Sequence, residues 1–197
     1  MRKMSSREIA VIGIMLALSL MLEIIPIEMP TMWGMKIDLV AVPVIMAYLL
    51  TGFVGGLTAV FLLFIGLSLI SPTSWLGGFM KASATLAVLI GFEAARWITR
   101  FDFERANRRR VVLFAVLAYI LGIAVRIPLM VAFNYYFAIQ MFLGIPHERV
   151  VQAVEEWTHV PFWVAIGLPN AVQSVIDVFI SLAVTLPVLR RLPHLFE

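Results

Sequence analysis

Residues 111–136 read VVLFAVLAYILGIAVRIPLMVAFNYY and contain one charged side chain, Arg126. The hydrocarbon core of a bilayer is about 30 Å thick and a helix rises about 1.5 Å per residue, so a membrane-crossing helix needs about 20 consecutive apolar residues. The apolar run in residues 111–136 is long enough to meet this requirement. It predicts a helix that crosses a membrane.

Five further apolar stretches accompany this one, and Pro, Gly or charged residues separate each stretch from the next. The second is short and is joined to the third by Thr51-Gly52-Phe53, so this pair forms either two tilted spans or a partly re-entrant hairpin. The sequence predicts an all-α membrane protein of about six transmembrane helices, in one transmembrane domain over residues 1–197. The six stretches are 9–25, 38–51, 53–70, 75–99, 111–136 and 162–189.

The composition supports the same class of protein. Hydrophobic residues make up 62% of the chain and charged residues 14%, whereas soluble domains have roughly 45–50% apolar and about 25% charged residues. The absence of cysteine excludes disulfides and thiolate chemistry. A net charge of +3 would suggest a nucleic-acid partner in a soluble basic protein, but in a membrane protein the position of each charge matters more. We therefore expect no nucleic-acid partner.

Basic residues gather before the first stretch, between the fourth and the fifth, and after the last. An even number of predicted crossings separates these clusters, so they share one side, which the positive-inside rule makes the cytoplasm. Both termini are therefore expected in the cytoplasm, with Trp33, Trp75, Trp157 and Trp163 at the outer interface. The basic residues are Arg2, Lys3 and Arg7, then Arg96, Arg100, Arg105, Arg108, Arg109 and Arg110, then Arg190 and Arg191.

The motifs of common enzyme classes are missing from the sequence. It has no HExxH, GxSxG, P-loop or GxGxxG pattern. The histidines His147, His159 and His194 fall in loops or at the tail without the spacing of metal ligands. We expect no catalytic residue, no bound metal and no cofactor.

Charged side chains within a bilayer are costly, so the few that are not at an interface are candidates for structural or functional roles. Arg126 lies about 22 Å along its helix from the cytoplasmic start, and Asp177 lies about 18 Å from the cytoplasmic end of the last helix. Their similar depth predicts a structural ion pair, and a ligand contact is the alternative. Glu93 is expected to pair with Arg96 on one helical face.

Polar amides are scarce, and Asn134 and Asn170 are the two asparagines outside the basic loop. Gln173 follows one turn after Asn170, and Lys81 lies about 9 Å into the fourth helix from the outer side. These groups are predicted to meet at one depth in the outer half. They either join helices by hydrogen bonds or line a pocket for a flat ligand with polar edges, and both interpretations stay open.

Small residues form a stripe on the first helix at Ala10, Gly13 and Ala17. Such stripes let two helices approach closely. They usually indicate contact within a chain and sometimes contact with a partner subunit.

The chain resembles the substrate-binding S components of energy-coupling-factor (ECF) vitamin transporters, particularly their riboflavin-binding branch. The resemblance covers nearly the whole chain and rests on the order and spacing of several motifs. They are Lys36-Ile37-Asp38-Leu39 through Pro43, the glycines Gly52, Gly55 and Gly56, Asn134-Tyr135-Tyr136, and Pro169-Asn170.

This resemblance implies a multi-pass receptor in the cell membrane that captures a vitamin from the outside. The receptor would dock on a transmembrane coupling subunit and two ATPase subunits. Riboflavin is the first candidate ligand. The alternatives are another vitamin, such as thiamine or biotin, or a membrane scaffold without transport.

The resemblance also implies roles for single residues. Asn134 and Asn170 would bind the edge of a flavin ring, with Tyr135 beside them. Gln173 stands where the riboflavin branch has a lysine, and Lys81 is a candidate for the missing cation. Lys36 and Asp38 would order the outer loop over the site, and the stripe Ala10, Gly13 and Ala17 would contact the coupling subunit.

Overall fold

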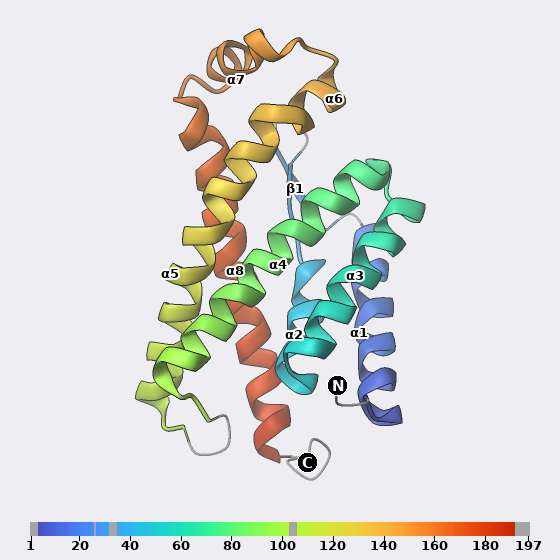
Figure 1. The fold of residues 1–197 in the computed structure, drawn as a ribbon, viewed down its shortest axis with the longest axis vertical. Coiled ribbons are helices and arrows are strands. Elements are labelled where there is room, and N and C mark those ends of the chain that lie inside the picture. Colours follow the sequence, from blue (N-terminus) through green and yellow to red (C-terminus); the bar gives the residue numbers. More distant parts are fainter. Residues whose placement is uncertain (1–3, 26, 32–34, 103–105, 192–197) are drawn as a thin grey trace.

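The computed structural model describes residues 4–25, 27–31, 35–102 and 106–191. Long helices form a bundle, with a short hairpin inserted and a helical cap at one end (Figure 1). The expectations for Arg2, Lys3, Trp33, Arg105 and His194 lie outside the described residues. The long helices are α1 (Ser6–Ile24), α3 (Phe53–Ile70), α4 (Ser74–Thr99), α5 (Arg108–Phe133) and α8 (Phe162–Arg191).

Shorter elements complete the fold. The strands β1 (Met29–Pro30) and β2 (Lys36–Ile37) pair antiparallel between α1 and α2. Helix α2 (Ala41–Thr51) has 11 residues, as expected from the short second stretch. After α5 the chain continues as a π-helical turn η1 (Asn134–Ala138), α6 (Ile139–Leu143), a 3-10 turn η2 (His147–Arg149) and α7 (Val150–Thr158).

Four helices in the described part of the chain are long and apolar enough to cross a membrane. They are α3, α4, α8 and the run Arg108–Leu143, which joins α5, η1 and α6. Helix α1 carries Arg7, Glu8 and Glu23, and α2 is shorter than a span. All six predicted apolar stretches are therefore helical, whereas length and composition identify four of them as candidate spans.

The helix ends follow local sequence signals. The Ser5 hydroxyl accepts a hydrogen bond from the Glu8 amide (3.2 Å), and the Glu8 carboxylate accepts one from the Ser5 amide (2.7 Å), which is a capping box. Asn107 caps α5 by accepting a hydrogen bond from the Arg110 amide (3.0 Å). Gly52 alone separates α2 from α3, at a φ of +83° that favours glycine.

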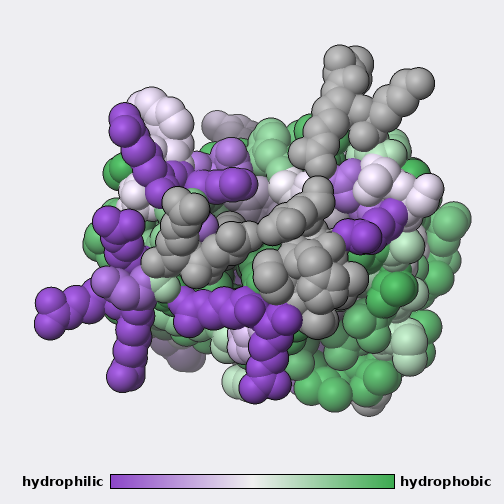
Figure 2. Space-filling model, turned by 90° about the horizontal axis from the view of Figure 1, so that it is seen from below, coloured by the Kyte–Doolittle hydropathy of each residue, from purple (hydrophilic) through white to green (hydrophobic). Residues whose placement is uncertain are grey.

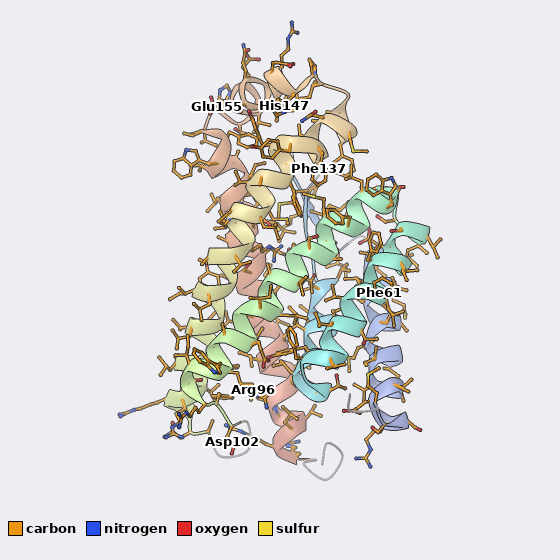
Figure 3. All side chains as sticks on the ribbon, viewed as in Figure 1. Phe61, Arg96, Asp102, Phe137, His147 and Glu155 are labelled. Atoms are coloured by element: carbon orange, nitrogen blue, oxygen red, sulfur yellow. The ribbon has the colours of Figure 1, made fainter. Side chains whose placement is uncertain are left out.

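The start of α1, the end of α8, the end of α4 and the start of α5 lie at one end of the molecule (Figure 1). Figure 3 places Arg96 and Asp102 at this lower end, and His147 and Glu155 at the opposite end. Figure 2, viewed from below, shows hydrophilic side chains gathered over the lower end. The described parts of the three basic clusters therefore share one face, as the spacing of the apolar stretches predicted.

Helices α4 and α5 cross at a pair of glycines. A Cβ added to Gly91 would lie 2.4 Å from the backbone nitrogen of Gly122, so no larger residue fits without separating the helices. Phe92 and Phe114 are fully buried next to this crossing, with ring centroids 5.8 Å apart. Glu93 accepts a hydrogen bond from the buried Tyr48 hydroxyl (2.7 Å), which joins α4 to α2. This crossing fixes the lower half of the bundle.

Helix α7 closes the upper end. It buries Val150 and Val154 against a second apolar cluster that contains Phe162 and Ile166 of α8. Its other side carries the exposed Glu155 and further polar residues. The upper half of the bundle, between the α4–α5 crossing and this cap, holds the cleft described next.

Candidate ligand-binding cleft

A cleft of about 830 Å³, counting its open mouth, lies among α1, the hairpin, α4, α5 and α8. Methionines and small apolar residues form part of its wall, including Met35, Met80, Ala84 and Met130. Its polar lining is Glu23, Lys36, Asp38, Ser71, Thr73, Lys81, Thr85, Arg126, Asn134, Asn170, Gln173 and Asp177.

Arg126 is held by α8 at the floor of the cleft. Its Nη1 donates to Asp177 Oδ2 (2.7 Å) and to the Ser174 hydroxyl (3.4 Å), and its Nε donates to Asn170 Oδ1 (2.9 Å). Arg126 is 4% exposed and Asp177 is fully buried. The structure thus brings together the two charges whose depths matched in the sequence, and it adds Asn170 to the same network.

Gln173 connects α8 to the residue that follows the hairpin. Its Nε2 donates to the Asp38 carbonyl (2.8 Å), and its Oε1 accepts from the Asp38 amide (2.9 Å). The same Nε2 also lies 2.7 Å from Asp177 Oδ1. The side-chain amide therefore pairs with the backbone of Asp38 as a neighbouring strand would, so it holds the hairpin against α8.

Asp38 and Lys81 form the second charged group of the cleft. The Lys81 ammonium is paired with Asp38 Oδ2 and lies 3.4 Å from Glu23 Oε2. The other oxygen of Glu23 accepts from the Ser71 hydroxyl (2.7 Å), and Asp38 Oδ1 accepts from the Val40 amide (2.9 Å). This group joins α1 and α4 to the start of α2.

Lys36 belongs to the hairpin and lines the mouth of the cleft. Its ammonium lies 2.8 Å from a Glu28 carboxylate oxygen. The hydrogen bond that the Lys36 ammonium donates to Glu28 raises the pKa of Lys36, so the ammonium stays protonated at neutral pH.

The two asparagines have different hydrogen bonds. Asn134 Nδ2 donates to the Met130 carbonyl (2.8 Å), while its Oδ1 has no hydrogen-bond partner among the described residues. Asn170 donates to the Ile166 carbonyl (2.9 Å) and accepts from Arg126, so both ends of its amide are engaged. Asn170 is at the level of Arg126, which precedes Asn134 by eight residues, or about 12 Å of helix. The polar groups share one cleft but span a range of depths.

Tyr135 lies beneath the cap and is not one of the residues that line the cleft. Its ring centroid is 4.5 Å from that of His147 and 6.1 Å from that of Phe162. His147 Nδ1 lies 2.9 Å from Gln140 Nε2, which can donate to it. The geometry gives Tyr135 a place in the packing of the cap, and a ligand contact for it stays a prediction.

Glu23, Thr85 and Ser71 line the cleft but were not assigned to a site by sequence reasoning. Glu23 lies near the end of α1. Its partner Lys81 is 58 residues away on α4, so no local pattern could reveal the pair. Thr85 and Ser71 resemble ordinary helix and loop residues, and no signal in the sequence distinguishes them.

The small-residue stripe of α1 faces away from the bundle. Ala10, Gly13 and Ala17 are exposed, and a Cβ added to Gly13 would have no neighbour within 4 Å. The stripe therefore has no packing role within the described part of the chain. The opposite face of α1 buries Ile12 and Ser19, and the Ser19 hydroxyl donates to the Val40 carbonyl.

Comparisons with known proteins agree with this architecture. The family profile described as "ECF transporter, substrate-specific component" matches residues 7–189. A solved structure titled "Structure and mechanism of the S component of a bacterial ECF transporter" superposes with a TM-score of 0.61 at 17% sequence identity. The superposition covers 96% of this chain and 97% of that one. No curated protein sequence matches significantly.

The fold is that of a helical membrane protein with a polar cleft among its helices. Because the family profile spans nearly the whole chain, the chain belongs to the substrate-specific components of ECF transporters. Members of this family bind a transported substrate, are not enzymes and carry no catalytic cofactor. The family also implies association with the transmembrane and ATPase subunits of the transporter.

Proposed function

We propose that this chain captures a vitamin from outside the cell in the cleft of its upper half, and that riboflavin is the vitamin. The observation that carries the proposal is the cleft itself, which combines an apolar wall with the free Oδ1 of Asn134 and a charged floor. Such a mixture suits a flat ring system with a polar edge and a hydroxylated side chain.

The charges of the cleft favour a neutral ligand. Three acidic residues and three basic residues occur in its described lining, so their formal charges cancel. Each cation has a carboxylate partner: Asp177 for Arg126, Asp38 together with Glu23 for Lys81, and Glu28, which lies outside the lining, for Lys36. Riboflavin is neutral at pH 7, whereas thiamine is a cation and biotin an anion. A charged vitamin would have to break one of these pairs or be buried without a partner.

In this proposal the chain crosses the membrane six times, counting α1 and α2, and both termini are cytoplasmic. The shared face of the basic clusters supports this orientation through the positive-inside rule. The cleft then opens to the outside. Single cysteines test the orientation in a chain that has none of its own: an impermeant maleimide on intact cells should label Glu156→Cys and leave Asp102→Cys unlabelled. The reverse pattern would invert the proposed topology.

The exposed stripe of α1 is proposed as the contact with the coupling subunit. Ala10, Gly13 and Ala17 present backbone rather than bulky side chains, which permits a close approach by a partner helix. The two ATPase subunits would then act through that coupling subunit.

Calorimetric titration of the purified chain with riboflavin, thiamine and biotin tests the choice of ligand. We expect saturable binding of riboflavin and at least roughly tenfold weaker binding of the two charged vitamins, because each lacks a free counter-charge in the cleft. Tighter binding of thiamine or biotin would assign the cleft to that vitamin. A chain that binds none of the three would favour the alternative of a scaffold without transport.

A further inference from the structure

Arginines and apolar side chains of α5 form a second surface feature, outside the cleft, at the lower end of the molecule. A shallow open groove on the surface of α5 is lined by Arg108, Arg109, Val112, Leu113 and Val116. Arg108, Val112 and Val116 are four residues apart, as are Arg109 and Leu113, so the five side chains lie on one side of the helix. The groove therefore has two cations at the start of the helix and an apolar floor that follows them along the chain.

The floor is open to the surroundings. Val112 is 53% exposed, Leu113 55% and Val116 39%. The span Arg108–Leu143 begins at the first arginine, so the guanidinium groups lie at the membrane interface while the floor enters the hydrocarbon region. In this placement the arginines lie at the level of lipid headgroups and the apolar floor lies at the level of the acyl chains.

Within the described part of the chain, no carboxylate neutralises the cations of the groove. Among the described residues, Arg108 and Arg109 have no ion pair, and no acidic residue lines the groove. The end of the helix is already capped by Asn107, so the anion-binding capacity here comes from the side chains. This contrasts with the cleft, where every cation has a carboxylate partner.

We propose that this groove binds an anionic phospholipid. The phosphate would lie between the guanidinium groups of Arg108 and Arg109, which suit bidentate contact with phosphate oxygens. An acyl chain would cover Val112, Leu113 and Val116. A headgroup that adds a positive amine is disfavoured, because two arginines and no carboxylate line the groove. The wider face is also rich in hydrophilic side chains (Figure 2).

Native mass spectrometry tests this site independently of the vitamin. The whole chain is placed in nanodiscs of equal parts phosphatidylglycerol and phosphatidylcholine with identical acyl chains, and the lipids that remain bound after release are counted. The wild type should retain phosphatidylglycerol preferentially. If Arg108 and Arg109 contact the phosphate directly, each contributes about a fivefold preference, so the R108A/R109A variant should lose roughly 25-fold of the preference for phosphatidylglycerol.

Two controls separate the groove from general charge effects. R100A/R191A removes two arginines from the same face but not from the groove, so it should keep the wild-type preference. V116W leaves every charge in place but fills the floor, so it should lower retention. Equal retention of both lipids by the wild type would overturn the proposal. So would an equal loss in R100A/R191A, because the preference would then follow only the charge of the face.

Discussion

The ion pair between Arg126 and Asp177 lies where water cannot stabilise an isolated charge. Replacing either residue by Ala should cost roughly 3–5 kcal/mol of unfolding free energy, because the remaining charge stays buried without its partner. The double replacement should cost less than the sum of the single ones. Thermal or denaturant unfolding in detergent measures the stability of the wild type, the two single variants and the double variant. Strictly additive losses would show that the two side chains do not interact.

The free carbonyl of Asn134 distinguishes it from Asn170. Asn134→Leu removes an acceptor that no described residue uses, so it should weaken riboflavin binding by roughly tenfold to a hundredfold with little change in stability. Asn170→Leu removes the partner of Arg126 Nε, so it should lower stability by about 1–3 kcal/mol as well. Titration and unfolding of both variants separate the two roles. If both variants bound riboflavin like the wild type, neither asparagine would be a ligand contact.

Scarcity of polar residues in an apolar sequence identified several residues of the cleft. Arg126, Asp177, Asn134 and Asn170 were found because each one is expensive in a membrane. The pair of Arg126 with Asp177 also followed from their similar depth, and the structure contains it. The contact of Arg126 with Asn170 did not follow, because the long Arg126 side chain reaches groups on another helix at more than one height. Depth along a helix therefore predicted one ion pair but not the wider hydrogen-bond network.

At the scale of elements, the long helices were predictable and the short ones were not. Each apolar stretch of the sequence corresponds to one helix, because a stretch of this length and hydropathy has a single stable form in lipid. The two-residue strands β1 and β2 and the nine-residue α7 have too few residues for a periodic signal. They are fixed by tertiary contacts, such as the pairing of Gln173 with Asp38.

The crossing of α4 and α5 gives a prediction with an internal control. Gly91→Ala should destabilise the chain by roughly 1–3 kcal/mol, because its Cβ would lie 2.6 Å from the Ala118 carbonyl oxygen. Gly13→Ala makes the same chemical change where no atom lies within 4 Å, so it should be neutral or slightly stabilising. Melting temperatures of the two variants test the contrast. Equal melting temperatures would mean that the two helices separate easily.

The open face of α1 leads to a prediction about coupling. Gly13→Leu and Ala17→Leu should leave riboflavin binding by the isolated chain nearly intact, since neither residue lines the cleft. Both should block uptake when the transporter is complete, because bulk on the stripe keeps a partner helix away. Uptake by vesicles and binding in detergent are measured in parallel. A parallel loss of binding and uptake would place the stripe in the fold of the chain itself.

At the scale of the whole molecule, the basic lower end, the glycine crossing and the capped upper end divide the chain into two halves. The lower half is tightly packed, with Phe92 and Phe114 fully buried, while the upper half encloses the polar cleft. This division agrees with a receptor that binds its ligand in one half of the membrane. The fold class followed from hydropathy alone, whereas the cleft depends on contacts between distant helices.

The central claim is that the cleft of this chain binds a neutral vitamin. Native mass spectrometry after incubation with an equimolar mixture of riboflavin, thiamine and biotin tests it most directly. The mass of the wild-type protein should increase by the mass of one riboflavin molecule. Ala84→Phe, which fills the cleft wall, should gain none while keeping its helical content. Absence of any bound vitamin on the wild type, or equal binding by Ala84→Phe, would contradict the claim.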